Sequence, residues 1–250
     1  MPTPRLVGLL TGPETITLVR HGESVGNLAD VEAHRLGAER LALDARDADV
    51  ELSDRGRRQA RALHDWLHDA DADDRPDLVL SSPYRRAAET ARIAVEGLGL
   101  EVLLDERLRE RSLGAFDGLT GRGIRAHYPE EAERRSKVGK FYYRPPSGES
   151  WADVVLRIRS LLADLRHGYE GVRVLVFSHE AVIKSFRYVL DGMDEQELME
   201  VDRGTRLANA SVSTWRRSGR DLVLDSFADA TVVDRADTEV TAEAGASPDD

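Results

Sequence analysis

The segment Thr17–Ser24, which reads Thr-Leu-Val-Arg-His-Gly-Glu-Ser, places reactive residue types at the end of an apolar run. The apolar part suits a short buried strand, whereas Arg20 and His21 are poor core residues. Gly22 lacks the Cβ that would keep a ligand away from the backbone. We therefore interpret the segment as a strand that delivers a nucleophilic histidine into an anion-binding pocket.

Two short polar side chains, Ser24 and Asn27, follow this strand and are able to donate hydrogen bonds to an oxyanion. Taken alone, however, such a short motif is better explained as a strand end with solvated charges. The chemical interpretation therefore depends on partners elsewhere in the chain.

A first partner follows the predicted strand Pro76–Leu80. Pro83 suits the first turn of a helix, whose N-terminus presents free N–H groups and a positive dipole. Arg86 lies just inside that helix. We expect its side chain to point the same way as Arg20.

Two further partners come from the second half of the chain. The apolar run Val172–Phe177 predicts a fully buried parallel strand, and His179 follows it, as His21 follows the first strand. Glu110 is a carboxylate in a glycine-containing loop that also holds the apolar residues Leu108, Leu113 and Phe116. Because ligands bind at the carboxyl ends of strands in open α/β sheets, we expect these residues to converge.

The remaining patterns indicate the elements that position these residues. Leu52–Asp69 predicts a helix capped by Ser53, and Trp151–Leu165 carries the strongest helical stripe of apolar residues. Residues 211–227 predict a hairpin, whereas residues 129–148 are expected to be mostly irregular. We predict an α/β three-layer sandwich, with a mostly parallel sheet and helices on both faces.

The predicted organisation is one domain over residues 15–227. Residues 1–14 form a loosely ordered lead-in, and residues 228–250 form an acidic, disordered tail.

Composition limits the classes of function. The chain has 250 residues, 41% of them hydrophobic, and a formal net charge of −11. This acidity argues against nucleic acid or an anionic membrane as partner. The absence of cysteine excludes disulfides, thiolate zinc sites and cysteine nucleophiles. No apolar run is long enough to cross a membrane or act as a signal peptide, so we expect a cytoplasmic protein.

Jointly, these residues resemble the histidine phosphatase superfamily, also called phosphoglycerate mutase-like, over about residues 15–227. The matching motifs are Leu18–Ser24, Leu52–Ser53 with Gln59–Ala60, Ser81–Ala87, Leu108–Glu110 with Gly114 and Gly118, and Ser178–His179.

The resemblance implies a role for each main residue. His21 is the nucleophile that forms a phosphohistidine, while Arg20, Arg86 and His179 surround the phosphoryl oxygens. Glu110 is the proton donor, for which a raised pKa is needed. Ser24 and Asn27 resemble residues that contact phosphate or substrate. No metal or other cofactor is required.

Two subfamily signatures overlap in the substrate region. Tyr143-Arg144 ahead of Gly148–Ser150, with Lys184 after the second histidine, resembles fructose-2,6-bisphosphatases, whereas Arg134-Arg135-Ser136 resembles the substrate arginines of phosphoglycerate mutases. Both signatures are incomplete, because Leu113, Ser147 and Glu180 depart from them.

Glu180 is the sharpest anomaly, since an ionised carboxylate beside the pocket repels a multiply charged anion. Pairing with Lys184, four residues on, would lessen that effect. Such a carboxylate would also favour a substrate with a hydroxylated or cationic portion.

The sequence therefore predicts metal-independent hydrolysis of a small phosphomonoester, such as a sugar phosphate or related metabolite. The alternatives are a phosphoglycerate mutase and, from another class, a weakly active module that binds a phosphorylated ligand. The oligomeric state stays open, with a homodimer as one alternative.

Overall fold

One mixed sheet organises the computed structural model, which describes residues 12–235 and 239–242. Within these residues the strand order is β3-β2-β4-β1-β5-β6; the first four strands are parallel, β5 pairs antiparallel with β1, and β6 pairs antiparallel with β5. The strands are β1 (Thr15–Arg20), β2 (Leu78–Ser81), β3 (Val102–Leu104), β4 (Arg173–Ser178), β5 (Val212–Ser218) and β6 (Asp221–Asp229).

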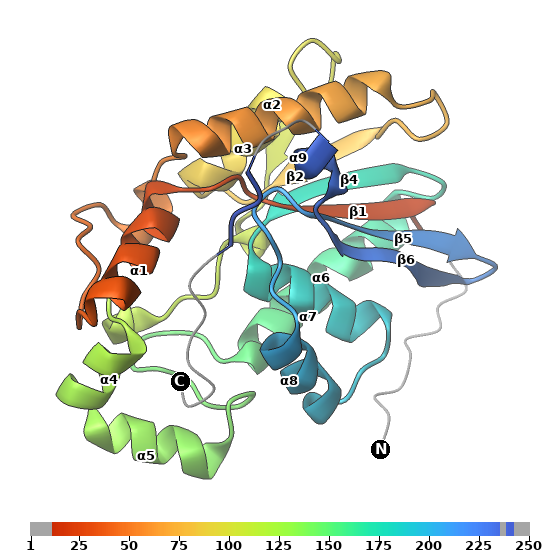
Figure 1. Ribbon diagram of the computed structural model, residues 1–250. Coiled ribbons are helices and arrows are strands. Elements are labelled where there is room, and N and C mark those ends of the chain that lie inside the picture. The colour runs from red at the N-terminus through yellow and green to blue at the C-terminus, as the bar shows by residue number, and fades with distance from the viewer. Residues whose placement is uncertain (1–11, 236–238, 243–250) are drawn as a thin grey trace.

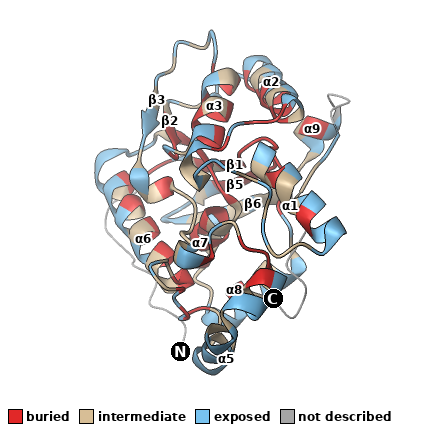
Figure 2. Ribbon diagram, turned by 90° about the vertical axis from the view of Figure 1, so that its left-hand side faces the viewer, coloured by how far each residue is buried: buried red, intermediate tan, exposed pale blue. Residues whose placement is uncertain are grey.

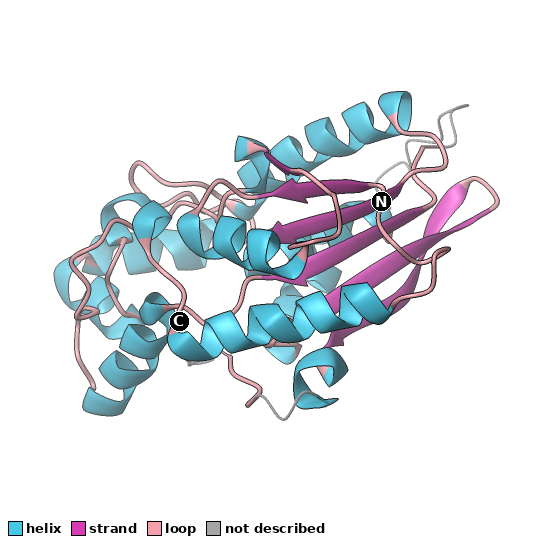
Figure 3. Cartoon of the chain, turned by 90° about the horizontal axis from the view of Figure 1, so that it is seen from above, coloured by secondary structure: helices cyan, strands magenta, loops and turns pink. Residues whose placement is uncertain are grey.

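Helices cover both faces of this sheet, as Figures 1 and 3 show. One face carries α2 (Asp54–Asp69), α3 (Arg85–Ala94) and α9 (Thr231–Arg235), and the other carries α6 (Trp151–Gly168) and α7 (Glu180–Leu190). The predicted three-layer architecture with a mostly parallel sheet is confirmed.

The central strands are buried on both faces, which explains their apolar sequences (Figure 2). In β4, Val174 and Val176 pack toward α6 and α7, whereas Leu175 and Phe177 pack toward α2 and α3. Because successive side chains of a strand point to opposite faces, each residue joins one of two separate cores. The rigid strands then end in the predicted polar residues.

The remaining elements occupy the connections between these layers. They are α1 (Val25–Leu36), α4 (Gly121–His127), α5 (Pro129–Val138), α8 (Glu195–Gly204) and the single 3₁₀ turns η1 (Asp47–Asp49), η2 (Glu106–Leu108) and η3 (Gly114–Phe116). In Figure 1, α1, α4 and α5 gather beyond one end of the sheet. Strand β1 ends at Arg20 and the chain continues into α1. His21 therefore lies at the end of the sheet where α1, α4 and α5 gather.

Part of the segment expected to be irregular is helical. Helix α5 begins with Pro129 at its first turn, carries Glu130 and Glu131 there, and has Arg135 and Lys137 in its last turn. Proline at a helix start and charges that complement the helix dipole are helix signals even where an apolar stripe is missing.

The chain beyond residue 227 also differs from the expected disordered tail. Strand β6 continues to Asp229, and α9 follows because Val233 is buried against the α2 and α3 core. Gln59 Nε2 donates to the Glu239 carbonyl and to Thr241 Oγ1. Residues 1–11, 236–238 and 243–250, which complete the predicted lead-in and tail, lie outside the described residues.

No described helix is both long enough and apolar enough to cross a lipid bilayer.

Backbone close contact fixes α2 against the segment that follows β1. A Cβ on Gly56 would lie 1.9 Å from the Glu23 carbonyl oxygen, and one on Gly22 would lie 2.5 Å from the Gly56 carbonyl oxygen. Gln59 Oε1 accepts from the Glu23 N–H at 2.8 Å. The glycine after His21 thus makes room for α2. That it also lets a ligand approach stays a prediction.

We predict that Gly56→Ala destabilises the protein by about 1–3 kcal/mol, because the added methyl group meets backbone that cannot rotate away. The midpoint of urea denaturation measures this change. Gly168→Ala is the matched control, since nothing lies near that position and alanine is the better helix former. Equal midpoints for the two variants would contradict the close contact.

Candidate active site

His21 is held in one orientation at the end of β1. Its backbone N–H donates to the Ser178 carbonyl at 3.0 Å, and the Asn209 side chain and Ala210 N–H donate to its carbonyl. Its Nδ1 lies 2.7 Å from the Gly22 carbonyl oxygen. Because a carbonyl oxygen only accepts, Nδ1 carries the hydrogen and Nε2 keeps its lone pair.

The surroundings of His21 favour the neutral imidazole. Burial, and next the charges of Arg86 and Arg20, lower the pKa of His21 well below its ordinary value of 6.5. A neutral ring with a lone pair on Nε2 is the form that can attack phosphorus.

Two guanidinium groups reach the imidazole from different elements. Arg86, from the first turn of α3, donates from Nε to His21 Nε2 at 3.3 Å and from Nη1 to the Asp47 carbonyl and carboxylate at 2.6 and 2.8 Å. Arg20 is buried at the end of β1, where its Nη1 contacts the Leu207 carbonyl. Both positive charges act on His21, as a site for an anion requires.

His179 occupies the end of β4, beside His21. The two ring centroids are 5.1 Å apart, and His179 Nε2 lies 2.8 Å from Ser82 Oγ, at the end of β2. Burial, and next the charge of Arg86, lower the pKa of His179 well below 6.5. Its buried Nδ1 has no hydrogen-bond partner among the described residues and lies 3.9 Å from Glu110 Oε2.

The Glu110 carboxylate borders this pair of imidazoles. Its side chain is 23% exposed, and its Oε1 accepts from the Arg111 N–H at 2.7 Å. Arg157 contacts the carbonyls of Arg107 and Glu110, while Glu149 accepts from Arg157 and Arg109. The Gly148-Glu149 sequence therefore positions the loop that carries Glu110.

Close backbone contacts bring the same two loops together. Gly114 has a φ of +57°, and a Cβ on it would lie 2.2 Å from the Pro146 carbonyl oxygen. A Cβ on Gly148 would lie 2.7 Å from the Ser112 carbonyl oxygen. Glycine is required at both positions, which gives a physical reason for these residues in the motifs.

The structure thus brings together the five residues that the sequence placed in the catalytic group. A neutral imidazole, two guanidinium groups, a second imidazole and a carboxyl group lie near one another. Such an arrangement is able to bind a tetrahedral anion, stabilise its charge during transfer and move one proton.

The residues predicted to contact substrate are placed differently from one another. Ser24 and Asn27 form a capping box at the start of α1, where Asn27 Oδ1 also accepts from Asn209 Nδ2 at 3.2 Å. Arg135 lies close enough to Arg111 for their charges to interact.

Three other residues predicted to contact substrate are paired with acidic side chains. Arg134 is 66% exposed and 3.7 Å from Glu131. Tyr143 is buried, and its hydroxyl donates to Glu131 at 2.8 Å; burial and this hydrogen bond raise the pKa of Tyr143 to about 12. Arg144 is paired with Asp153 on the surface.

The carboxylate of Glu180 has the expected partner. Lys184 Nζ lies 2.6 Å from Glu180 Oε1, and Arg20 Nη1 lies 3.3 Å from Oε2. Glu180 is therefore an ion-paired group rather than an isolated charge next to the pocket.

Sequence reasoning missed several residues at the site. Ser82 follows β2 as His21 follows β1, so the strand-end rule could have found it. Arg111 follows Glu110 directly, and its guanidinium lies 5.5 Å from the Trp151 ring centroid. Asp47 lies in a segment without periodicity, where no signal pointed to a contact with Arg86.

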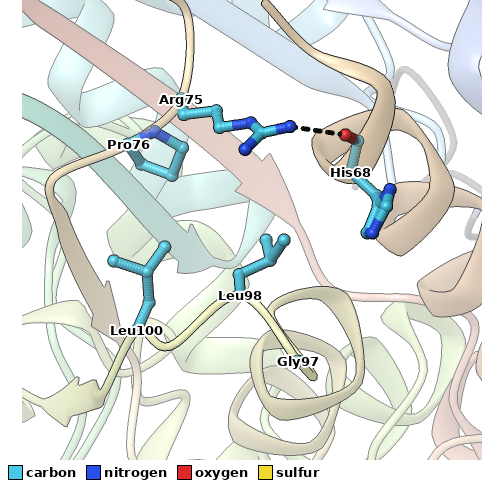
Figure 4. Close-up of a pocket in the computed structure, with 6 residues that line it drawn as sticks. All are labelled: His68, Arg75, Pro76, Gly97, Leu98 and Leu100. Atoms are coloured by element: carbon cyan, nitrogen blue, oxygen red, sulfur yellow. Dashed lines mark hydrogen bonds between the residues drawn. The ribbon is translucent and has the colours of Figure 1, made fainter. Parts of the chain in front are cut away.

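A hollow of about 220 Å³ lies elsewhere, near the start of β2 (Figure 4). Arg75, which lines it, donates to the carbonyls of His68 and Ala70. His64 and His68 stack at 5.9 Å, and among the described residues no three metal-ligating side chains gather.

Comparisons with known proteins add an independent result. A model for the histidine phosphatase superfamily (branch 1) matches residues 16–230. Two curated relatives are the bifunctional protein Rv2228c of Mycobacterium tuberculosis, 40% identical over 119 residues, and a 6-phosphofructo-2-kinase/fructose-2,6-bisphosphatase of Caenorhabditis elegans, 34% identical over 173 residues. The matches cover 45% and 69% of this chain but only 31% and 33% of the relatives, so the chain spans about a third of their length.

Solved structures share the fold over most of the chain. A mycobacterial glucosyl-3-phosphoglycerate phosphatase, in complex with VO3, is 28% identical and superposes with a TM-score of 0.69. The superposition covers 87% of this chain and 100% of that one. This similarity supports the predicted fold class.

We predict that acid destabilises the protein through the two buried imidazoles. Above pH 6.5 both imidazoles are neutral in the folded and in the unfolded protein. Below pH 6.5 they bind protons in the unfolded chain but stay neutral in the folded one, because the folded structure lowers their pKa values. The free energy of unfolding then falls by up to about 1.4 kcal/mol per pH unit for each histidine. In urea denaturation, the free energy of unfolding of His21→Gln should fall less steeply between pH 6.5 and 5.5 than that of the wild type. The control His68→Gln, at an exposed position, should fall as steeply as the wild type. Identical slopes for all three proteins would be the contrary result.

Proposed function

The chain belongs to the histidine phosphatase superfamily, branch 1, and from that premise we propose that it is a metal-independent phosphatase of small phosphomonoesters. The observation that carries the proposal is the hydrogen bond from His21 Nδ1 to the Gly22 carbonyl. It leaves Nε2, beside Arg86, as the atom that attacks.

In the first proposed step, His21 Nε2 forms a bond to phosphorus while the bond from phosphorus to the ester oxygen breaks. Arg20, Arg86 and His179 stabilise the charge on the transferring oxygens, and Glu110 gives its proton to the leaving alkoxide. The phosphorylated imidazole keeps its hydrogen on Nδ1, where the Gly22 carbonyl accepts it.

In the second step, water attacks the phosphohistidine from the side that the alcohol has left. Glu110, now a carboxylate, takes a proton from that water. The bond from phosphorus to Nε2 breaks, and His21 returns to its neutral form. Each group is then ready for another cycle, since the proton that Glu110 gave has been replaced.

A phosphate ester of a hydroxylated metabolite is the proposed substrate. The names of the two similar enzymes, a fructose-2,6-bisphosphatase and a glucosyl-3-phosphoglycerate phosphatase, describe esters of this kind. The ion-paired state of Glu180 is consistent with a substrate body rich in hydroxyl groups.

Phosphoglycerate mutase is the second candidate, and the nearness of Arg111 and Arg135 is the observation that favours it. Two neighbouring guanidinium groups suit the carboxylate of a phosphoglycerate. The candidates differ in product, because a mutase interconverts the two monophosphoglycerates faster than it releases phosphate.

His21→Ala should lower phosphate release by about 10³-fold or more, because the atom that accepts the phosphoryl group is lost. A panel of phosphorylated metabolites, which includes monophosphoglycerates and fructose bisphosphates, is assayed for phosphate in the presence of EDTA. His64→Ala, on the outer side of α2, is the control. Equal release by wild type and His21→Ala would favour the binding-module alternative, and loss of wild-type turnover in EDTA would contradict metal independence.

Glu110→Gln should affect substrates according to their leaving group. For glycerol 2-phosphate, whose alkoxide needs a proton, kcat/KM should fall by about 10²–10⁴-fold. For p-nitrophenyl phosphate, whose phenolate leaves unaided, the fall should be much smaller. Glu106→Gln, at an exposed position on the same loop, controls for a general effect of the substitution. A similar fall for both substrates would argue against Glu110 as the acid.

A further inference from the structure

A row of alternating charges runs from the candidate site to the surface. We call it the charge chain: Arg20, Glu180, Lys184, Asp202 and Lys140. Arg20 Nη1 lies 3.3 Å from Glu180 Oε2, and Lys184 Nζ bridges Glu180 and Asp202 at 2.6 and 3.0 Å. Lys140 Nζ lies 2.9 Å from the other oxygen of Asp202.

Most of the charge chain is buried. The side chains of Arg20 and Lys184 are 1% and 2% exposed, whereas that of Lys140, at the outer end, is 33% exposed. Burial alone would raise the pKa of Asp202, but Lys184 and Lys140 outweigh it and hold that pKa below its usual range. Charges in such surroundings are weakly screened, so a change of one unit is felt by neighbouring groups.

Glu180 is the member of the charge chain that adjoins the reacting groups. It follows His179 directly, and its carboxylate contacts the guanidinium of Arg20. Arg20 also donates to the Leu207 carbonyl, and Glu180 Oε1 accepts from the Leu207 N–H at 3.4 Å. The neutral Leu207 carbonyl already helps to hold Arg20 in place. The Glu180 carboxylate therefore adds negative charge to a position that is already fixed.

We propose that Glu180 sets the charge of the pocket and so selects esters that carry one phosphoryl group and no second anionic group. The charges of Arg20, Glu180, Lys184 and Asp202 sum to zero, and the one further cation of the charge chain, Lys140, lies at its outer end. The inner part of the charge chain therefore offers no net positive charge to a second anion. This inference rests on the proposed phosphatase function and deepens it.

The test compares glucose 6-phosphate with glucose 1,6-bisphosphate, which differ by one phosphoryl group. In Glu180→Gln the ratio of kcat/KM, bisphosphate over monophosphate, should rise about tenfold, because a unit of negative charge is lost a few ångströms from the substrate. In Glu180→Gln with Lys184→Met the net charge of the wild type is restored, so the ratio should return close to the wild-type value.

Two single variants serve as further controls. Lys184→Met should lower the ratio, since it leaves an excess negative charge, and this variant decides the matter if Glu180→Gln does not fold. Asp202→Asn makes the same charge change as Glu180→Gln, but farther from Arg20 along the charge chain. It should therefore raise the ratio of kcat/KM, bisphosphate over monophosphate, by less than Glu180→Gln does.

A binding measurement separates the failure of this inference from the failure of the proposed function. Calorimetry measures the binding of orthophosphate and pyrophosphate without any turnover. The ratio of affinities, pyrophosphate over orthophosphate, should be higher for Glu180→Gln than for the wild type. If the wild type hydrolyses neither these two esters nor any member of the metabolite panel, the proposed function fails while the calorimetric ratio still tests Glu180. An unchanged preference in folded Glu180→Gln, or a double variant that matches Glu180→Gln, would overturn the charge-setting role.

Discussion

A buried imidazole that must stay neutral among cations is the constraint on which the site depends. Burial together with Arg86 and Arg20 disfavours the protonated form of His21, and the Gly22 carbonyl determines which nitrogen carries the remaining hydrogen. The same positive charges that keep the ring neutral would also attract the phosphoryl anion. In the proposed function, one electrostatic arrangement thus prepares the nucleophile and binds its target.

The fold maintains this arrangement through contacts of the backbone rather than of flexible side chains alone. Parallel strands β1, β2 and β4 bring His21, Ser82 and His179 to one end of the sheet. Helix α2 packs on the chain at Gly22 so closely that only glycine fits. Glu149 fixes two arginines that border the Glu110 loop, so that the Glu110 carboxylate is positioned from a different part of the chain.

The sequence predicted these parts unequally, for physical reasons. Arg20, His21 and His179 were predictable because strand ends in a parallel sheet converge. Glu110 lies on a loop, and its place beside them depends on the contacts of that loop. The contacts of Tyr143, which packs inward, and of Arg144, which pairs on the surface, were not predictable, because local patterns do not encode such tertiary contacts. Their role toward substrate stays a prediction. Asp47 accepts a hydrogen bond from Arg86, but it lies in a segment whose sequence shows no periodicity. Helix α9 forms because Val233 packs into a core built by residues far away in the sequence.

The central claim, that His21 Nε2 is the neutral phosphoryl acceptor, is tested most directly by the chemical identity of the trapped intermediate. The protein, labelled with ¹⁵N in histidine, is mixed with substrate and quenched in base, and the linkage is read by mass spectrometry and by NMR of the imidazole nitrogens. The account predicts a phosphoryl group on Nε2 of His21. Phosphate on Nδ1, on His179 or on no histidine while turnover proceeds would contradict it.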